Sequence, residues 1–172
     1  MKDKNAPVTA ANGGNPVQQR SDPGDVAAFL RAASALRQDG AGKGRLILAL
    51  DATMSRQPTW DLACTLQAEM FDAAAGTDRL AIQLVYFRGH DECRASRFVG
   101  NAAALKELML KIDCRGGHTQ IGKVLSHALK ATAKEKVAAL VYIGDALEEA
   151  IDDLADKAGR LGLHGVPVFI FQ

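Results

Sequence analysis

The stretch Arg45-Leu-Ile-Leu-Ala-Leu-Asp51 decides how this chain folds. Its central residues are all aliphatic, and such a short uninterrupted run is typical of a strand that is buried on both faces of a sheet. Strands of this kind occur in parallel sheets that helices cover on both sides. We therefore expect a strand over 45–50 at the centre of an α/β domain.

Strand and helix patterns alternate along the rest of the chain. The turn-forming run Arg88–Asp91 between two strand patterns predicts an antiparallel hairpin. The alternation predicts a doubly wound, mostly parallel sheet with one antiparallel edge strand and helices on both faces. Further strands are expected over 80–87, 94–99, 137–143 and 166–171, and helices over 23–36, 60–75, 100–112, 120–134 and 147–161.

The chain has 172 residues, which is enough for one domain. Residues 1–22 are rich in Asn, Gln, Gly, Pro and Ala and contain no aromatic residue. Such a segment buries too little apolar surface to offset its ordering entropy. We expect a flexible tail over 1–22 and a single domain over 23–172.

The composition excludes several classes of function. Lys and Arg total 21 and Asp and Glu total 20, so the net charge of +1 favours neither a nucleic acid nor a membrane surface as partner. No apolar run approaches the roughly 18 residues of a membrane span. An odd number of cysteines, Cys64, Cys93 and Cys114, argues against a disulfide framework and for a reducing, cytoplasmic setting.

Oxygen-bearing side chains follow two of the predicted buried strands and one glycine loop. Asp51-Ala-Thr-Met-Ser55 presents a carboxylate and two hydroxyls, Thr119 follows Gly116-Gly117, and Asp145 ends the strand over 137–143. Ligands of open α/β sheets bind at the carboxyl ends of strands. Hard oxygen donors suit Mg²⁺. Helix capping by Thr53, Ser55 or Thr119 is the alternative interpretation of each residue alone.

This pattern resembles the metal ion-dependent adhesion site of von Willebrand factor type A domains, which reads Asp-x-Ser-x-Ser, then a distant Thr and a distant Asp. The resemblance runs from about Arg45 to Phe171 and is closest to bacterial stand-alone domains. It implies a Rossmann-like fold, no enzymatic activity, and a bound Mg²⁺, or Mn²⁺ or Ca²⁺ in its place. The metal residues that the resemblance implies are Asp51, Thr53, Ser55, Thr119 and Asp145.

In the roles that the resemblance implies, the hydroxyls of Thr53 and Ser55 ligate the ion, and Thr119 does so directly or through water. Asp51 and Asp145 act largely through water, and a protein partner supplies an Asp or Glu carboxylate to the open position. The chain departs from the family in having Thr53 where Ser is usual and Ala146 where Gly is frequent. It also ends on a predicted strand, without the family's last helix, strand and helix.

Other interpretations stay open on the sequence alone. Asp51 could be the nucleophile of a Mg²⁺-dependent phosphoryl-transfer enzyme similar to haloacid dehalogenases, although Thr53 stands where those enzymes carry a second Asp. The domain could also be a structural interaction module without metal. His90-x-x-Cys93 and Cys114-x-x-x-His118 have spacings that occur in zinc sites. The acidic residues between Glu148 and Asp156 predict a solvated helix face or a partner surface.

Overall fold

The computed structural model of the protein describes residues 44–56 and 80–171. The predicted tail over 1–22, the helices over 23–36 and 60–75, and Cys64 lie outside these residues. The described strands are β1 (Gly44–Asp51), β2 (Leu80–Arg88), β3 (Glu92–Val99), β4 (Ala139–Ile143) and β5 (Val168–Phe171). The described helices are the 3-10 turn η1 (Met54–Arg56), α3 (Ala102–Met109), α4 (Ile121–Lys134) and α5 (Ile151–Leu163).

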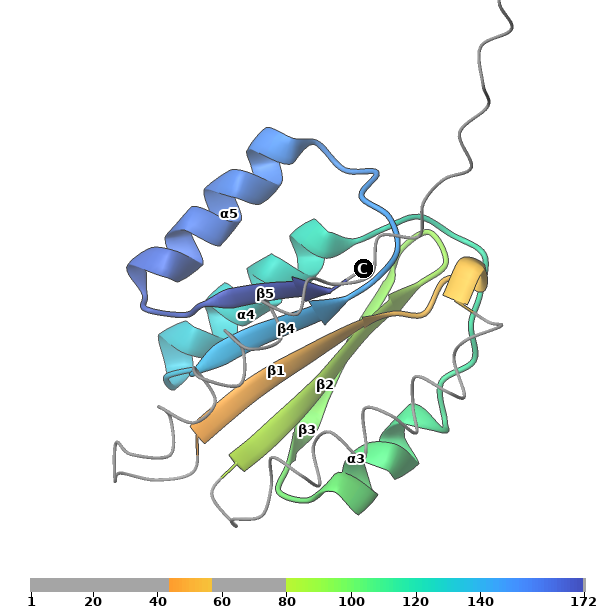
Figure 1. Ribbon diagram of the computed structural model, residues 1–172, viewed down its shortest axis with the longest axis horizontal. Coiled ribbons are helices and arrows are strands. Elements are labelled where there is room, and N and C mark those ends of the chain that lie inside the picture. Colours follow the sequence, from red (N-terminus) through yellow and green to blue (C-terminus); the bar gives the residue numbers. More distant parts are fainter. Residues whose placement is uncertain (1–43, 57–79, 172) are drawn as a thin grey trace, which may run out of the picture.

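The described strands form one sheet in the order β3-β2-β1-β4-β5 (Figure 1). β1 runs parallel to both β2 and β4, and β4 runs parallel to β5. β3 pairs with β2 in the antiparallel direction and takes one edge. These pairings confirm the predicted sheet with its single antiparallel edge strand.

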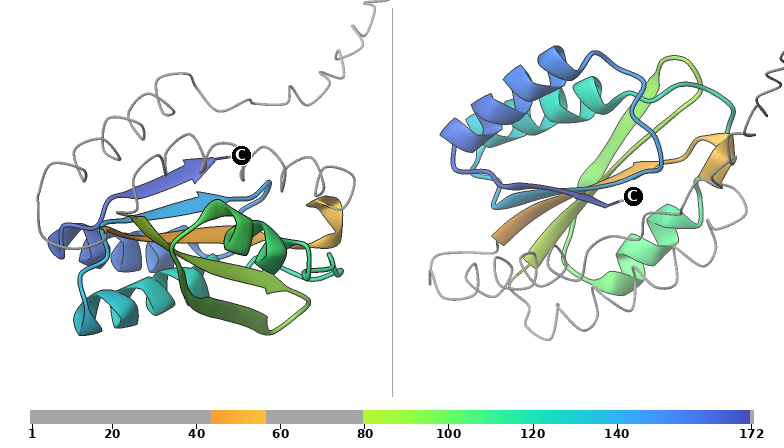
Figure 2. Two further views of the ribbon diagram at one scale, coloured as in Figure 1. Left: turned by 90° about the horizontal axis from the view of Figure 1, so that it is seen from below. Right: turned by 45° about the horizontal axis from the view of Figure 1, so that its top comes forward.

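Successive residues of β1 face two separate hydrophobic cores. Leu46, Leu48 and Leu50 pack with Leu105 and Met109 of α3. Ile47 and Ala49 pack on the other side, against residues of α4 and α5. Figure 2 shows α4 and α5 next to each other on one side of the sheet. Helices therefore cover both faces, and the continuous aliphatic run of β1 is explained because both faces of this strand are buried.

Several elements are shorter than their sequence patterns predict, among them β4, which begins at Ala139 rather than at 137. α3 ends at Met109 rather than at 112, because tighter bonds from Lys111 N to Leu108 O and from Ile112 N to Met109 O replace the helical ladder. The strand predicted from 166 begins at Val168, and the helix predicted from 147 begins at Ile151. No helix in the described part of the chain is long and apolar enough to cross a membrane.

Candidate functional site

The loop that leaves β1 is held by backbone bonds on both of its sides. Ala52 N donates to Phe87 O of β2 at 3.0 Å, and Ala52 O accepts from Arg115 N at 3.0 Å. Thr53 forms an isolated parallel bridge with Arg115. The segment before α4 therefore runs directly alongside the residues that follow β1, which brings the loop of Thr119 toward Asp51 and Thr53.

Asp51 is the last residue of β1 and is only 1% exposed. Its Oδ1 atom accepts a hydrogen bond from Thr53 N at 2.8 Å. Its Oδ2 atom is buried and has no hydrogen-bond partner within the described residues. Buried carboxylate oxygens without a partner are rare in folded proteins, because the lost hydration is not replaced.

The hydroxyls of Thr53 and Ser55 lie together at the same loop. Thr53 Oγ1 and Ser55 Oγ are 3.0 Å apart, and the short turn η1 is closed by a bond from Arg56 N to Thr53 O at 3.1 Å. Thr53 is buried at 7% exposure, whereas Ser55 is exposed. The turn thus places two hydroxyl oxygens at one point, beside a buried carboxylate.

The glycine loop before α4 packs against the turn between β2 and β3. A Cβ atom on Gly117 would lie 2.0 Å from the carbonyl oxygen of Gly89, so only glycine permits this approach. His118 N donates to the same oxygen at 3.2 Å, and the side chain of Gln120 donates to it at 3.2 Å as well. This packing sets the position of Thr119, which is 6% exposed.

Thr119 does not cap α4; it is bound instead by the loop between β4 and α5. Thr119 N donates to Glu148 Oε2 at 2.9 Å, and Thr119 Oγ1 accepts from Glu148 N at 3.2 Å. Glu149 accepts from the backbone N–H groups of Ile121 and Gly122, the latter at 2.9 Å. The residue at the N-cap of α4, Gln120, makes no side-chain cap bond. Glu149 therefore caps the first turn of α4 from a distant loop, and Glu148 holds Thr119 just before that helix.

Asp145 follows β4 after one intervening glycine and is exposed. Beneath it lies Tyr142, which is 2% exposed and stacks on Phe87 with ring centroids 6.2 Å apart. A Cβ on Gly144 would lie 2.2 Å from the Tyr142 hydroxyl, so glycine is required between this ring and Asp145. The buried Tyr142 hydroxyl has no hydrogen-bond partner among the described residues.

The electrostatics of this edge of the sheet disfavour negative charge. Burial raises the pKa of Asp51, the hydrogen bonds from Thr53 lower it, the nearby charge of Asp145 raises it, and Arg56 lowers it. Burial also raises the pKa of Tyr142, and the charges of Asp51 and Asp145 raise it further. A cation held at this point would relieve the burial and the repulsion together.

The zinc interpretation of the cysteine and histidine pairs is wrong. Cys114 packs in the core on the α3 face of the sheet, whereas Cys93 packs against the core on the α4 face. His90 and His118 do meet, with ring centroids 5.2 Å apart. Across residues 44–56 and 80–171, however, no group of three or more His, Cys, Asp or Glu side chains could hold a metal ion.

The structure thus places the five predicted metal residues as follows. Asp51, Thr53 and Ser55 share one loop, Asp145 lies close enough to Asp51 to influence its pKa, and Thr119 stands on the loop that pairs with Thr53. These oxygen donors and the unpartnered Asp51 Oδ2 fit a hard cation such as Mg²⁺. Their role as metal ligands remains a prediction.

Sequence reasoning missed Tyr142 as part of this site and missed the contacts of Glu148 and Glu149. A tyrosine within an otherwise aliphatic strand pattern, three residues before Asp145, was the available signal for the first. The glutamates carried no such signal, because their partners lie 27–29 residues earlier in the chain.

Several solved structures are similar to this fold. The SpRpn10 VWA domain matches with a TM-score of 0.59 at 11% identity, over 74% of this chain and 74% of that chain. Proximal thread matrix protein 1 from the mussel byssus matches with a TM-score of 0.58 at 19% identity, over 76% of this chain and 35% of that one. The pilus adhesin SpaC from Lactobacillus rhamnosus GG matches with a TM-score of 0.51 at 12% identity, over 62% and 15%.

No protein-family model matches the sequence, and no curated protein matches it. The sheet order and the structural matches nevertheless define the class: the chain has the fold of a von Willebrand factor type A domain. At 11–19% identity these matches concern the fold alone, and the chain spans only 15% of SpaC and 35% of the byssus protein.

Proposed function

We propose that this protein is a metal-dependent protein-interaction domain. In this proposal one Mg²⁺ is held by Asp51, Thr53, Ser55, Thr119 and Asp145, and the ion presents an open position to a carboxylate of a partner protein. Mn²⁺ and Ca²⁺ are the expected substitutes, because both also prefer oxygen donors. A protein-interaction role agrees with the adhesin and matrix proteins among the structural matches.

One observation carries the proposal: Asp51 keeps a buried oxygen atom without a partner. Asp51 is 1% exposed, and its Oδ2 atom has no hydrogen bond within the described residues. A charged group is tolerated in such a place when a counter-charge or a metal accompanies it. When bound, the cation would supply that positive charge. The adjacent Thr53 and Ser55 oxygens, 3.0 Å apart, supply further donors of the kind that Mg²⁺ accepts.

Thr119 could reach a bound ion and keep its contact with the β4–α5 loop at the same time. Its hydroxyl oxygen accepts from Glu148 N at 3.2 Å, and its own proton is left to rotate. The hydroxyl oxygen carries two lone pairs, so it can keep the Glu148 bond while it faces a bound ion or a metal-held water. Thr119 therefore binds either directly or through water without a rearrangement of the β4–α5 loop.

Titration calorimetry tests the metal site. Wild-type protein should bind about one Mg²⁺ or Mn²⁺, weakly in the absence of a partner, because waters fill several positions around the ion. Asp51→Asn and Thr53→Val should abolish the heat of binding. Glu107→Gln, at an exposed position of α3 on the far side of the sheet from α4, serves as the matched control. No heat with either ion at millimolar concentration would refute the proposal.

We further propose that the domain is not an enzyme. A phosphoryl-transfer enzyme that used Asp51 as nucleophile would need an exposed carboxylate and a neighbouring acid or base. Asp51 is instead buried, and Thr53 occupies the position of the second carboxylate. An assay with an aryl phosphate separates the two functions, and turnover that disappears in Asp51→Asn would establish the enzymatic alternative.

The metal-free alternative predicts that the same five positions tolerate apolar substitution without loss of partner binding. We favour the metal-dependent form because all five carry oxygen side chains. The proposed partner is a protein that offers an Asp or Glu, with neither nucleic acid nor membrane involved. The proposed setting is cytoplasmic, for which the few cysteines of the sequence are the support.

A further inference from the structure

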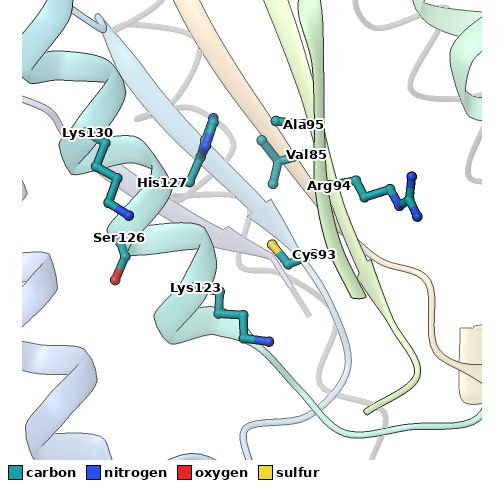
Figure 3. Close-up of a pocket in the computed structure, with 8 residues that line it drawn as sticks. All are labelled: Val85, Cys93, Arg94, Ala95, Lys123, Ser126, His127 and Lys130. Atoms are coloured by element: carbon teal, nitrogen blue, oxygen red, sulfur yellow. The ribbon is translucent and has the colours of Figure 1, made fainter. Parts of the chain in front are cut away.

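A groove of about 250 Å³ lies between α4 and the edge strand β3, apart from the proposed metal site. Its floor is formed by small and apolar side chains, those of Val85, Cys93 and Ala95. Figure 3 shows the α4 side chains of Lys123 and His127 across the groove from Cys93. Arg94 points away from the groove in this view, and its guanidinium pairs with Glu92 at 3.0 Å.

The α4 wall of this α4–β3 groove carries two lysines, Lys123 and Lys130, and one histidine, His127. Lys123, His127 and Lys130 recur at spacings of four and three residues, which places them on one side of the helix. Lys123 pairs with Asp91 and donates to Gln120 Oε1 at 2.9 Å. Within the described residues, Lys130 and Lys134 have no ion-pair partner, so their charges are uncompensated.

His127 is held in place by a hydrogen bond to its neighbour Gln83 on β2. The amide nitrogen of Gln83 donates to Ser96 O at 2.8 Å, so its amide oxygen is left to accept from His127 Nε2 at 2.8 Å. The histidine therefore carries its proton on Nε2, and Nδ1 remains available. Burial, Lys130 and Lys134 lower the pKa of His127. A bound anion would oppose all three effects and favour the imidazolium.

We propose that the α4–β3 groove binds acidic side chains of the same partner segment that supplies the carboxylate to the metal site. This inference rests on the proposed function. Charge complementarity identifies the occupant: Lys130 on the wall has no ion-pair partner within the described residues, the floor is uncharged, and a protein partner with one essential carboxylate is already proposed. Occupancy by inorganic phosphate alone is the competing outcome.

The geometry of α4 sets the spacing of the acidic residues. The helix begins two residues after Thr119, and Lys130 lies nine positions after Ile121, which is about 14 Å at 1.5 Å per residue. An extended peptide covers this distance in about four residues at about 3.3 Å each. A partner segment that runs along α4 from its N-terminus to Lys130 therefore spans the helix with about four residues.

Fluorescence anisotropy with a fluorescein-labelled octaglutamate peptide tests the groove without knowledge of the natural partner. The peptide should bind wild-type protein in EDTA at low salt, and an octaglutamine peptide should not. Lys130→Glu should weaken binding roughly three- to tenfold, as expected when an exposed charge pair is turned into a repulsion. Lys106→Glu, the same charge change at an exposed position of α3, should leave the affinity within about twofold.

Two further measurements separate this inference from the proposed function. The pKa of His127, measured by NMR titration, should rise when octaglutamate binds. The groups that surround this imidazole are Lys130, Lys134, Gln83 and Cys93. Mg²⁺ should increase the affinity of wild-type protein for octaglutamate but not that of Asp145→Ala. Peptide binding in EDTA together with no calorimetric heat for Mg²⁺ would refute the metal site and, with it, the shared partner segment.

Three results would overturn the groove itself. Equal losses in Lys106→Glu and Lys130→Glu would show unspecific attraction to the surface. Displacement of octaglutamate by millimolar inorganic phosphate, with the same shift of His127, would show a site for a small anion. If the protein binds Mg²⁺ in calorimetry but does not bind octaglutamate, the proposed metal site is supported and the proposed peptide-binding role of the groove is refuted.

Discussion

Replacing Glu149 with alanine removes the only side chain in the described structure that caps the first turn of α4. The carboxylate accepts from Ile121 N and from Gly122 N, and the helix has no cap from its own N-cap residue, Gln120. Two N–H groups would be left to water, and the negative charge beside the positive end of the helix dipole would be lost.

The magnitude follows from these two losses. Removal of a capping side chain costs about 0.5–2 kcal/mol, and a favourable charge at a helix N-terminus contributes about 0.3–1 kcal/mol. Glu149→Ala should therefore lower the free energy of unfolding by about 2 kcal/mol, which for a chain of this length lowers Tm by about 4–8 °C. Glu149→Gln keeps an acceptor and loses the charge, so about half of that loss is expected.

Urea unfolding followed by circular dichroism measures the effect, with EDTA present so that metal binding does not contribute. Glu107→Ala is the matched control: Glu107 is an exposed acid on α3, and its loss should stay within about 0.5 kcal/mol. If Glu149→Ala destabilises the protein no more than Glu107→Ala does, the Glu149 carboxylate does not cap α4.

Three other predictions concern the proposed metal site and the core beneath it. Leu48→Ala in the central strand should lower the free energy of unfolding by about 2–5 kcal/mol through lost burial and a cavity. Asp145→Ala, measured in EDTA, should have a Tm no lower than that of wild type. Equal losses of stability in the two variants would show that Asp145 is a structural residue. Burial raises the pKa of Asp51, so in EDTA its contribution to stability is fully present below its ordinary pKa of 3.8 and is lost as the pH rises through the raised value. Wild type measured against Asp51→Asn by urea unfolding should therefore lose relative stability between about pH 4 and neutrality, and a gain over that range would contradict the burial argument. Tyr142→Phe removes a buried hydroxyl that has no partner among the described residues, so melting should be unchanged or improved by up to about 1 kcal/mol, and a loss above that would show that the hydroxyl has a partner.

The strand patterns were enough to predict the sheet and the residues at its carboxyl edge. The aliphatic run of β1 could be interpreted because every one of Leu46–Leu50 is buried, at 0–3% exposure, so both faces had to be apolar. The turn over 88–91 implied an antiparallel partner because a connection that short cannot cross over to a parallel strand. The placement of Asp51 and Asp145 at one edge followed from parallel strands, whose carboxyl ends lie together.

Which side chains meet at that edge could not be predicted from the sequence and is seen only in the folded protein. Glu148 and Glu149 read as the beginning of a helix, yet they bind the backbone of Thr119, Ile121 and Gly122, and α5 starts later, at Ile151. The cysteines of the zinc-like spacings pack against opposite faces of the sheet. Periodicity reports which residues of an element are buried but not which distant loop they face, because that depends on the order in which the strands pair.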